Sequence, residues 1–216
     1  MGTVTDSRDA LLQELVPTIM VPKYGVLQPL ESAGRRFLAA SDGLWLEVKT
    51  DWLHLTWPLA KQNKVAMPYG TLEKKAEFLY GAFPVHLVRE FLGYARETFP
   101  NECAAWFIWD SAQREFMYRP LRAIRTGVGH LKYERPNLSS NESLVCDMHS
   151  HGPEHAYFSR TDDRDDCGET KISGVVGEIG GEGAPSACFR LCAAGITLPL
   201  NFNFKNILDL EVLLYV

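Results

Sequence analysis

The segment from Cys146 to Asp166 constrains this chain more than any other, because it combines two closely spaced histidines with a run of carboxylates. The apolar run just before the histidines is typical of a buried strand. Successive side chains of a strand point to opposite faces, so His149 and His151 point the same way. Asp162 follows a polar loop that contains Gly and Pro, where a helix can begin and carry the carboxylate back to the two rings.

These residue types indicate one divalent metal ion. Two imidazole nitrogens and one carboxylate oxygen are typical zinc ligands, and three protein ligands leave a fourth position for water. An open position favours catalysis over a purely structural site. A His-x-His pair alone is also compatible with ordinary polar residues of a strand, since neutral histidine occurs in cores and on surfaces. The interpretation therefore depends on the longer spacing.

That spacing is restrictive: His149, Ser150 and His151 are followed by seven residues, then Ser159, two more residues and Asp162. It resembles the JAMM motif of the MPN-domain metalloproteases. The resemblance implies that His149, His151 and Asp162 bind zinc and that Ser159 polarises the carbonyl under attack. It also implies an α/β fold, a mixed β-sheet with flanking helices of the cytidine-deaminase-like kind, and a distant upstream Glu as general base.

Glu102 meets this last demand. It precedes the apolar run from Ala104 to Trp109, and it follows a segment in which apolar residues recur at spacings of three and four between Pro84 and Pro100. That pattern predicts an amphipathic helix followed by a strand. The residues around Glu102 resemble the family's pattern, although the usual Gly is absent and Trp106 stands where an aliphatic residue is common. Alone, Glu102 reads as a solvated carboxylate at a strand end.

Composition sets outer limits on the function. The chain has 216 residues, 46% of them hydrophobic and 23% charged, as expected of an ordinary globular protein with a sizeable core. The formal net charge of −5 argues against a general nucleic-acid binder, because phosphates are held mainly by clustered Lys and Arg. We find neither a signal-peptide pattern nor an apolar stretch of membrane-spanning length. We therefore expect a cytoplasmic protein.

The five cysteines are odd in number and show no CxxC spacing, which predicts reduced thiols packed as small apolar residues. Cys188 and Cys192 are four residues apart, but nothing nearby completes a metal site. Cys103 and Cys146 lie beside the predicted site and raise the alternative of a nucleophilic cysteine. Both belong to or adjoin apolar strands, which do not favour an activated thiolate.

The pattern of prolines and apolar residues changes along the chain and predicts two domains. These are a β-rich N-terminal module over residues 1–80 and a JAMM/MPN metalloprotease-like domain over residues 81–216. Prolines punctuate short apolar runs in the first part. A turn and strand are predicted within Ala40–Thr50, and a second strand over Trp52–Trp57. The tryptophans there can form an aromatic binding surface, but we favour one packed face.

After Phe83 the pattern predicts a mixed sheet with helices. The predicted strands are Ala104–Trp109, Glu115–Ile124, Leu131–Arg135, the histidine-bearing strand, Ile172–Ile179 and Ala187–Ala193, with a helix over Asp162–Glu169. The glycine-rich run at 177–183 lacks the Lys and Ser or Thr of a phosphate-binding loop, so it predicts a hairpin. The apolar tail Ile207–Val216 can be a final strand, an edge cover or a dimer contact.

Other polar residues near the motif have ordinary interpretations. Asp163 is the nearest competitor of Asp162 as a ligand, and Asp147 and Asp165 can orient the rings. Most carboxylates of the acidic cluster are expected to be solvated near a helix N-terminus. His155 is expected to be exposed in the loop, and Ser159 can cap the helix.

Three further segments, at 21–30, 42–47 and 101–105, extend the resemblance to nearly the whole chain. They look like PRTRC system protein A, a plasmid- and island-borne bacterial family within the MPN superfamily. This resemblance implies a peptidase or isopeptidase that acts on a ubiquitin-like protein and its conjugates. The alternatives are a non-catalytic MPN scaffold, a hydrolase of another small amide, or a zinc deaminase. The last lacks support, because the Pro-Cys-x-x-Cys element is missing.

Overall fold

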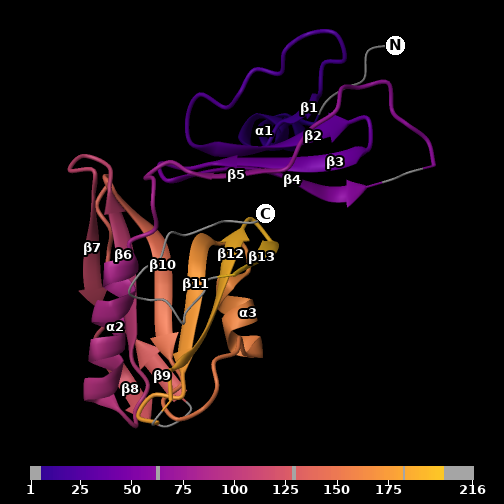
Figure 1. The fold of residues 1–216 in the computed structure, drawn as a ribbon. Coiled ribbons are helices and arrows are strands. Elements are labelled where there is room, and N and C mark those ends of the chain that lie inside the picture. The colour runs from indigo at the N-terminus through magenta and orange to yellow at the C-terminus, as the bar shows by residue number, and fades with distance from the viewer. Residues whose placement is uncertain (1–5, 62–63, 128–129, 182, 202–216) are drawn as a thin grey trace. The chain divides into compact units, whose positions relative to one another are not determined.

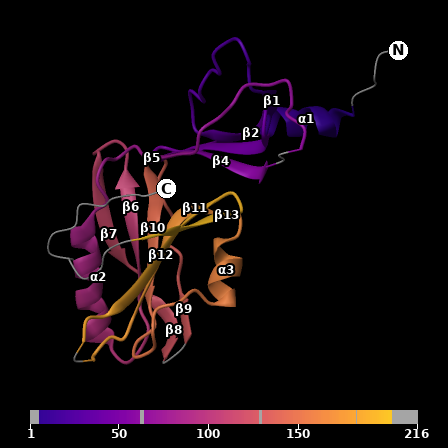
Figure 2. The same ribbon diagram turned by 45° about the vertical axis from the view of Figure 1, so that its right-hand side comes forward.

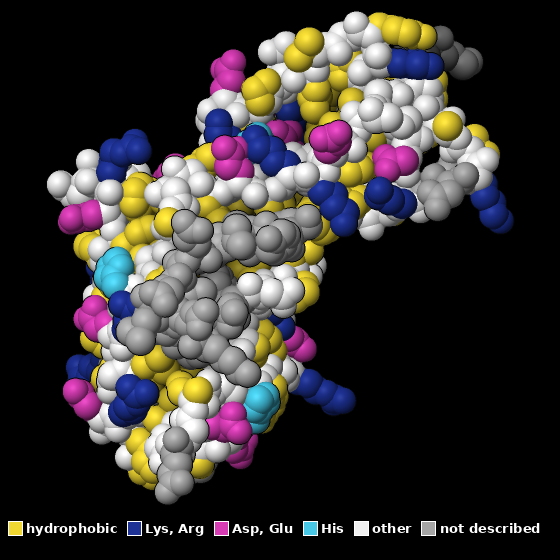
Figure 3. Space-filling model, viewed as in Figure 1, with side chains coloured by type: hydrophobic (Ala, Val, Ile, Leu, Met, Phe, Trp, Pro, Cys, Tyr) yellow, Lys and Arg dark blue, Asp and Glu magenta, His cyan; other side chains and the backbone are white. Residues whose placement is uncertain are grey.

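The computed structural model describes residues 6–61, 64–127, 130–181 and 183–201. The chain forms two compact units, one ending at Leu79 and the other beginning at Tyr80. Figure 1 labels the helices and strands of both units. The surface in Figure 3 mixes apolar side chains with charges of both signs, as globular surfaces do. None of the helices within the described ranges is both long and apolar enough to traverse a bilayer.

The first unit is a five-stranded sheet with one short helix, α1 (Ser7–Leu15). Its strands, in spatial order, are β1 (Thr18–Met20), β2 (Gly34–Ala40), β3 (Gly43–Lys49), β4 (Leu53–Lys61) and β5 (Lys75–Phe78). Trp45 and Trp52 are each 1% exposed, which confirms their predicted place in the core. Trp57 is only half-buried, and the ammonium of Lys74 lies 4.4 Å from its ring centroid.

The second unit contains a six-stranded mixed sheet in the order β13-β12-β11-β10-β6-β7. Its elements along the chain are α2 (Val85–Thr98), β6 (Ala104–Asp110), β7 (Glu115–Pro120), the hairpin β8 (Ala123–Gly127) and β9 (His130–Tyr133), β10 (Glu142–Ser150), α3 (Arg160–Asp166), β11 (Thr170–Gly177), β12 (Ser186–Ala193) and β13 (Ile196–Leu200). β10 and β11 are parallel, whereas the other neighbours in this sheet are antiparallel. The predicted fold class, a mixed α/β sheet with a β-rich N-terminal module, is confirmed.

The two faces of this sheet differ in chemistry. One cross-strand row is apolar and consists of Phe107, Cys146, Ile172 and Leu191, and the adjacent row consists of Trp106, Asp147, Ser173 and Arg190. Because side chains alternate along a strand, the two rows face opposite sides. Phe83, just before α2, contacts Phe107 with ring centroids 6.2 Å apart, so α2 belongs to the apolar face. α3 belongs to the other face, since its Asp166 pairs with Arg190 (Figures 1 and 2).

Several boundaries differ from the prediction for physical reasons. The predicted strand Glu115–Ile124 is wrong as one element: β7 ends at Pro120, and Leu121 turns inward into the core before β8 begins. Strand β13 was not predicted. The hairpin predicted at the glycine-rich run is confirmed, because β11 and β12 are antiparallel neighbours. The predicted strand at Ile207–Val216 lies outside the described residues.

Candidate metal centre

The centre of the sheet delivers both histidines to one place. His149 lies near the end of β10, opposite Ala104 of β6. His151 is the first residue after the strand ends. Two hydrogen bonds join the strand end to the segment before β6: the Ser150 amide donates to the Cys103 carbonyl (2.9 Å), and the Cys103 amide donates to Ser150 Oγ (3.0 Å). These bonds hold Cys103, the neighbour of Glu102, against Ser150, the neighbour of His151.

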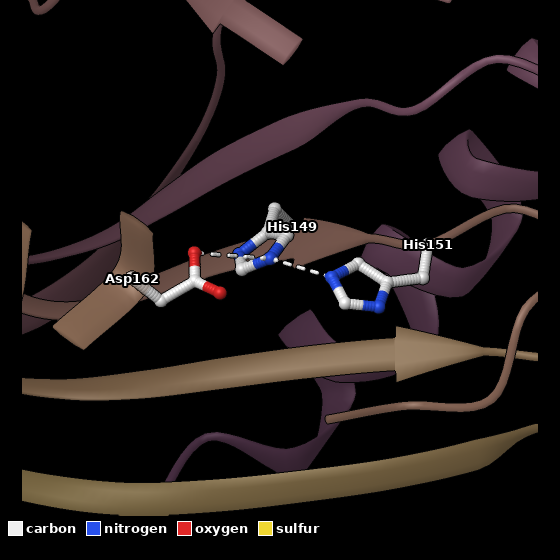
Figure 4. Close-up of side chains that lie close together, drawn as sticks. All are labelled: His149, His151 and Asp162. Atoms are coloured by element: carbon white, nitrogen blue, oxygen red, sulfur yellow. Dashed lines mark hydrogen bonds and ion pairs between the residues drawn. The ribbon is translucent and has the colours of Figure 1, made fainter. Parts of the chain in front are cut away.

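The three predicted ligands come together (Figure 4). One potential ligand atom from each of His149, His151 and Asp162 lies within 4.8 Å of the others. The Nε2 atoms of the two rings are 3.2 Å apart, and Asp162 Oδ1 is 3.5 Å from His149 Nε2. The cluster therefore joins the end of β10 to the first turn of α3, as the motif spacing predicts.

His151 and Asp162 each make a further contact that orients the side chain. His151 Nδ1 lies 3.4 Å from the carbonyl oxygen of His155, so a proton on Nδ1 leaves the Nε2 lone pair facing His149. Asp162 Oδ2 accepts from the Ser159 amide at 2.6 Å, which leaves Oδ1 directed at the histidines. Burial lowers the pKa of His149, although the Asp162 carboxylate opposes that shift. His149 is therefore held in the neutral form that binds metals.

Glu102 and Ser159 line the same cavity as the three predicted ligands, and its volume is about 380 Å³. Glu102 is 9% exposed, and its backbone is fixed at both polar atoms. Its amide donates to the Gly127 carbonyl (3.2 Å), and its carbonyl accepts from Thr126 Oγ1 (2.6 Å). The hairpin formed by β8 and β9 thus positions the glutamate's backbone at the cavity.

Ser159 is the N-cap of α3, which is the alternative role that the sequence allowed, and the helix spans Arg160–Asp166 instead of the predicted Asp162–Glu169. Its Oγ accepts from the amides of Thr161 (3.2 Å) and Asp162 (3.3 Å), and the Asp162 carboxylate returns a bond to the Ser159 amide. This reciprocal arrangement is a capping box. Both bonds use the hydroxyl as an acceptor, so its O–H is still available as a donor toward the cavity.

The loop after His151 is closely packed, which explains its glycine. Gly152 has φ +54°, and a Cβ there would lie 2.6 Å from the Pro100 carbonyl oxygen. Tyr157, at the other end of the loop, presents its ring edge-on to His151 with centroids 4.6 Å apart, and it is 49% exposed. The loop therefore supplies an aromatic wall to the cavity that the sequence did not reveal.

Several expectations for neighbouring carboxylates need correction. Asp147 does not contact a histidine through the bonds the structure shows; it accepts from Lys171 Nζ (3.0 Å) and Tyr133 Oη (3.2 Å). Asp163 is outside the metal-binding cluster, because its Oδ1 pairs with Arg190 at 2.6 Å. Asp166 is an exception in the acidic cluster, most of which is expected to be solvated, because it is only 6% exposed. Two buried cations pair with it, as described below.

The remaining candidates behave more simply. His155 is exposed, as predicted, and pairs with Glu178 at 3.1 Å. Asp165 is exposed and lines the same cavity. All five cysteines are free thiols, and burial raises the pKa of both Cys103 and Cys146. A raised pKa disfavours the thiolate, so the structure gives no support to a cysteine nucleophile.

Comparison with known proteins agrees with this geometry. A family described as prokaryotic homologs of the JAB domain matches residues 84–191, which is half of the chain. The chain belongs to this family. The matched range contains Glu102 and the whole JAMM motif from His149 to Asp162. It therefore supports the broad family resemblance drawn from that motif. In this JAB-domain protein, residues 6–79 match a second family, described as a domain of unknown function, DUF2016.

Other comparisons add little. None of the curated proteins matches the chain. Among solved structures, the solution structure of protein DSY2949 from Desulfitobacterium hafniense is similar at 15% identity, covering 53% of this chain and 85% of that one, with a TM-score of 0.39. That score is too low to carry an argument about the JAB-domain protein described here.

Proposed function

We propose that this protein is a zinc-dependent peptidase or isopeptidase that hydrolyses an amide bond. The observation that carries the proposal is the convergence of His149, His151 and Asp162 in one cavity with Glu102 and Ser159. Membership of the JAB-domain family supports it, because that family includes metallo-isopeptidases as well as non-catalytic members.

The donor set fits zinc. Two neutral imidazoles and one carboxylate are a set that zinc commonly takes, and the ligand atoms are close enough to share one ion. His149, His151 and Asp162 would hold it. When bound, zinc supplies Lewis acidity, which makes water a nucleophile near neutral pH and polarises a carbonyl.

The other two residues have complementary tasks. Glu102 takes the proton of the attacking water and returns it to the leaving amine, as a general base and then a general acid. The Ser159 hydroxyl donates a hydrogen bond to the oxygen on which negative charge develops. Loss of such a donor costs roughly 3 kcal/mol of transition-state stabilisation. The helix cap orients this hydroxyl, since its acceptor side is bonded to backbone amides.

For the substrate, we propose a ubiquitin-like protein or its conjugates, processed in a bacterial system encoded on a plasmid or island. This narrower part rests on the resemblance of three segments to PRTRC system protein A. A protein substrate suits a cavity with an exposed aromatic side chain, Tyr157, at its wall.

The first experiment measures zinc per chain by elemental mass spectrometry and cleavage of a ubiquitin-like fusion in parallel. We expect about one zinc in the wild type, loss of zinc in His149→Ala, and zinc without turnover in Glu102→Gln. His86→Ala and Glu115→Gln are matched controls at exposed positions of the same unit. Full activity in Glu102→Gln would overturn the mechanism. Zinc binding without any cleavage would favour the scaffold alternative.

A further inference from the structure

Helix α3 carries Asp162 but lacks an apolar anchor. It has seven residues, Arg160–Asp166, and its only buried residue is the carboxylate Asp166. So short a helix is not stable on its own in water. Contacts other than hydrophobic burial must therefore hold it on the sheet.

Two buried cations supply these contacts. Arg190 on β12 donates from Nε to Asp166 Oδ2 (2.9 Å), its Nη2 lies 2.7 Å from the same oxygen, and its Nη1 lies 2.6 Å from Asp163 Oδ1. Lys171 on β11 reaches Asp166 Oδ1 at 3.0 Å. The guanidinium also lies 3.9 Å from the ring centroid of Phe158, just before the helix. Both ends of α3 are thus fixed by one arginine.

These anchors are one helical turn from the predicted ligand. Asp162 and Asp166 are four residues apart, so they lie on the same face of α3. Lys171 also bonds Asp147 at 3.0 Å, and Asp147 shares a face of β10 with His149 two residues later. One buried ammonium, 2% exposed, therefore connects the helix that carries Asp162 to the strand that carries His149.

We propose that Arg190 and Lys171 are positioning residues of the metal centre, which hold α3 where Asp162 reaches the two histidines. The inference rests on the function proposed above. The structure gives neither residue a hydrogen bond or ion pair to the three ligands; both bind Asp166, Arg190 also binds Asp163, and Lys171 also binds Asp147. Arginine suits this role because its N–H donors form a rigid planar fork that fixes the direction of each contact, whereas an ammonium on a flexible stem acts as a point charge.

Burial energetics favour positioning over bulk stability as the role of these pairs. Removing charges from water is costly, so a buried pair adds little net stability compared with apolar residues of the same volume. The pair nevertheless demands one geometry, because any shift of α3 leaves a buried charge without its partner. Burial opposes the charged form of Lys171, yet the Asp147 and Asp166 carboxylates outweigh it and raise its pKa. The anchor thus stays charged at neutral pH.

The test compares Arg190→Gln with Arg190→Lys in the full chain. Zinc affinity is measured by competition with a chromophoric chelator, and the visible spectrum of the cobalt-loaded protein reports the ligand geometry. The matched control is Arg119→Gln, which removes an arginine that pairs with Glu142 at 2.6 Å, at the opposite end of β10 from His149.

We expect Arg190→Gln to weaken zinc binding roughly tenfold or more and to alter the cobalt spectrum, as loss of supporting partners around metal ligands does. Arg190→Lys should recover part of both, and Arg119→Gln should match the wild type. A folded Arg190→Gln with wild-type affinity and spectrum would overturn the inference. So would equal losses in Arg119→Gln, because they would show a general structural effect.

A second variant covers the case in which Arg190→Gln does not fold. Asp163 is 60% exposed, so Asp163→Asn removes one arm of the anchor without burying a new charge. We expect it to fold and to weaken zinc binding about threefold, within the range of the loss of one largely exposed ion pair. Unchanged affinity and spectrum would then refute the inference. If the wild type itself binds no metal, the proposed function fails; if it binds metal and all variants match it, only this inference fails.

Discussion

Helices α2 and α3 flank the same sheet but are attached to it by opposite means. α2 has fourteen residues and buries an apolar stripe made of Leu87, Val88, Phe91, Leu92 and Ala95. α3 has seven residues and buries one carboxylate. The cross-strand row that faces α2 is apolar, whereas the row that faces α3 contains Asp147 and Arg190.

The difference separates stability from geometry. Apolar burial is non-directional. An interface like that of α2 therefore raises the free energy of unfolding but tolerates small shifts of the helix on the sheet. Ion pairs between buried groups add little net free energy but fix distances and angles. The helix that builds the core, α2, is therefore held to the sheet by buried apolar surface. The helix that carries a predicted ligand, α3, is held by directional ion pairs. Substitutions on the two faces of the sheet test this contrast, and the pH dependence of stability tests the histidine that α3 approaches.

The largest effect is expected on the α2 side. Phe91 is 0% exposed, so Phe91→Ala should lower the free energy of unfolding by about 4 kcal/mol, through lost burial and the cavity left behind. Urea unfolding measures the loss, with Glu90→Ala as an exposed control on the same helix. Zinc affinity of the folded variant should equal that of the wild type. A large drop in affinity would show that α2 also sets the site geometry.

A somewhat smaller loss is expected from Lys171→Met, about 3 kcal/mol, because it leaves Asp147 and Asp166 buried without their shared cation. Adding Asp147→Asn should recover part of the loss, since one orphaned charge disappears. Lys75→Met is the matched control, because Lys75 pairs with Glu77 at the surface, 2.7 Å apart. That pair should contribute less than about 1 kcal/mol. Equal effects at the two lysines would contradict the contrast between buried and exposed pairs.

The smallest effect concerns pH. Burial lowers the pKa of His149 from its ordinary value of 6.5, so the unfolded chain binds a proton there that the folded, metal-free protein does not. The unfolding free energy of metal-free protein should therefore fall as pH drops below 6.5 and should gain nothing from this group above that value. His149→Asn should remove this slope, whereas His86→Asn, at an exposed position on α2, should keep it. A slope that survives His149→Asn would assign it to another group.

The sequence predicted those parts of the site that depend on local periodicity and spacing. Two histidines separated by one residue share a strand face, and Ser159 and Asp162 fit the first turn of a helix. Apolar residues at helical spacing predicted α2 within one residue of its observed ends. Each of these inferences needs only neighbours in the chain.

The buried charges could not be predicted in the same way, because their partners are distant in the sequence. Arg190 and Asp166 are separated by 24 residues and meet only because β11 and β12 are adjacent. One signal was present: Lys171 and Arg190 are charged residues within strands that are otherwise rich in apolar residues, and a charge buried there requires a partner. The division of the predicted strand Glu115–Ile124 was missed for a related reason, since Leu121 turns into a core that is assembled from several elements.

One carboxylate group takes part in two structures at once. Asp162 uses Oδ2 to close the first turn of α3 on the Ser159 amide and directs Oδ1 at His149. If the cluster holds the proposed ion, fraying of that turn would withdraw a ligand, and the bound ion would in turn oppose fraying. Local opening of the helix and release of that ion would then be one kinetic event, so the hydrogen-exchange rate of the amides at the start of α3 would report how long the ion stays bound.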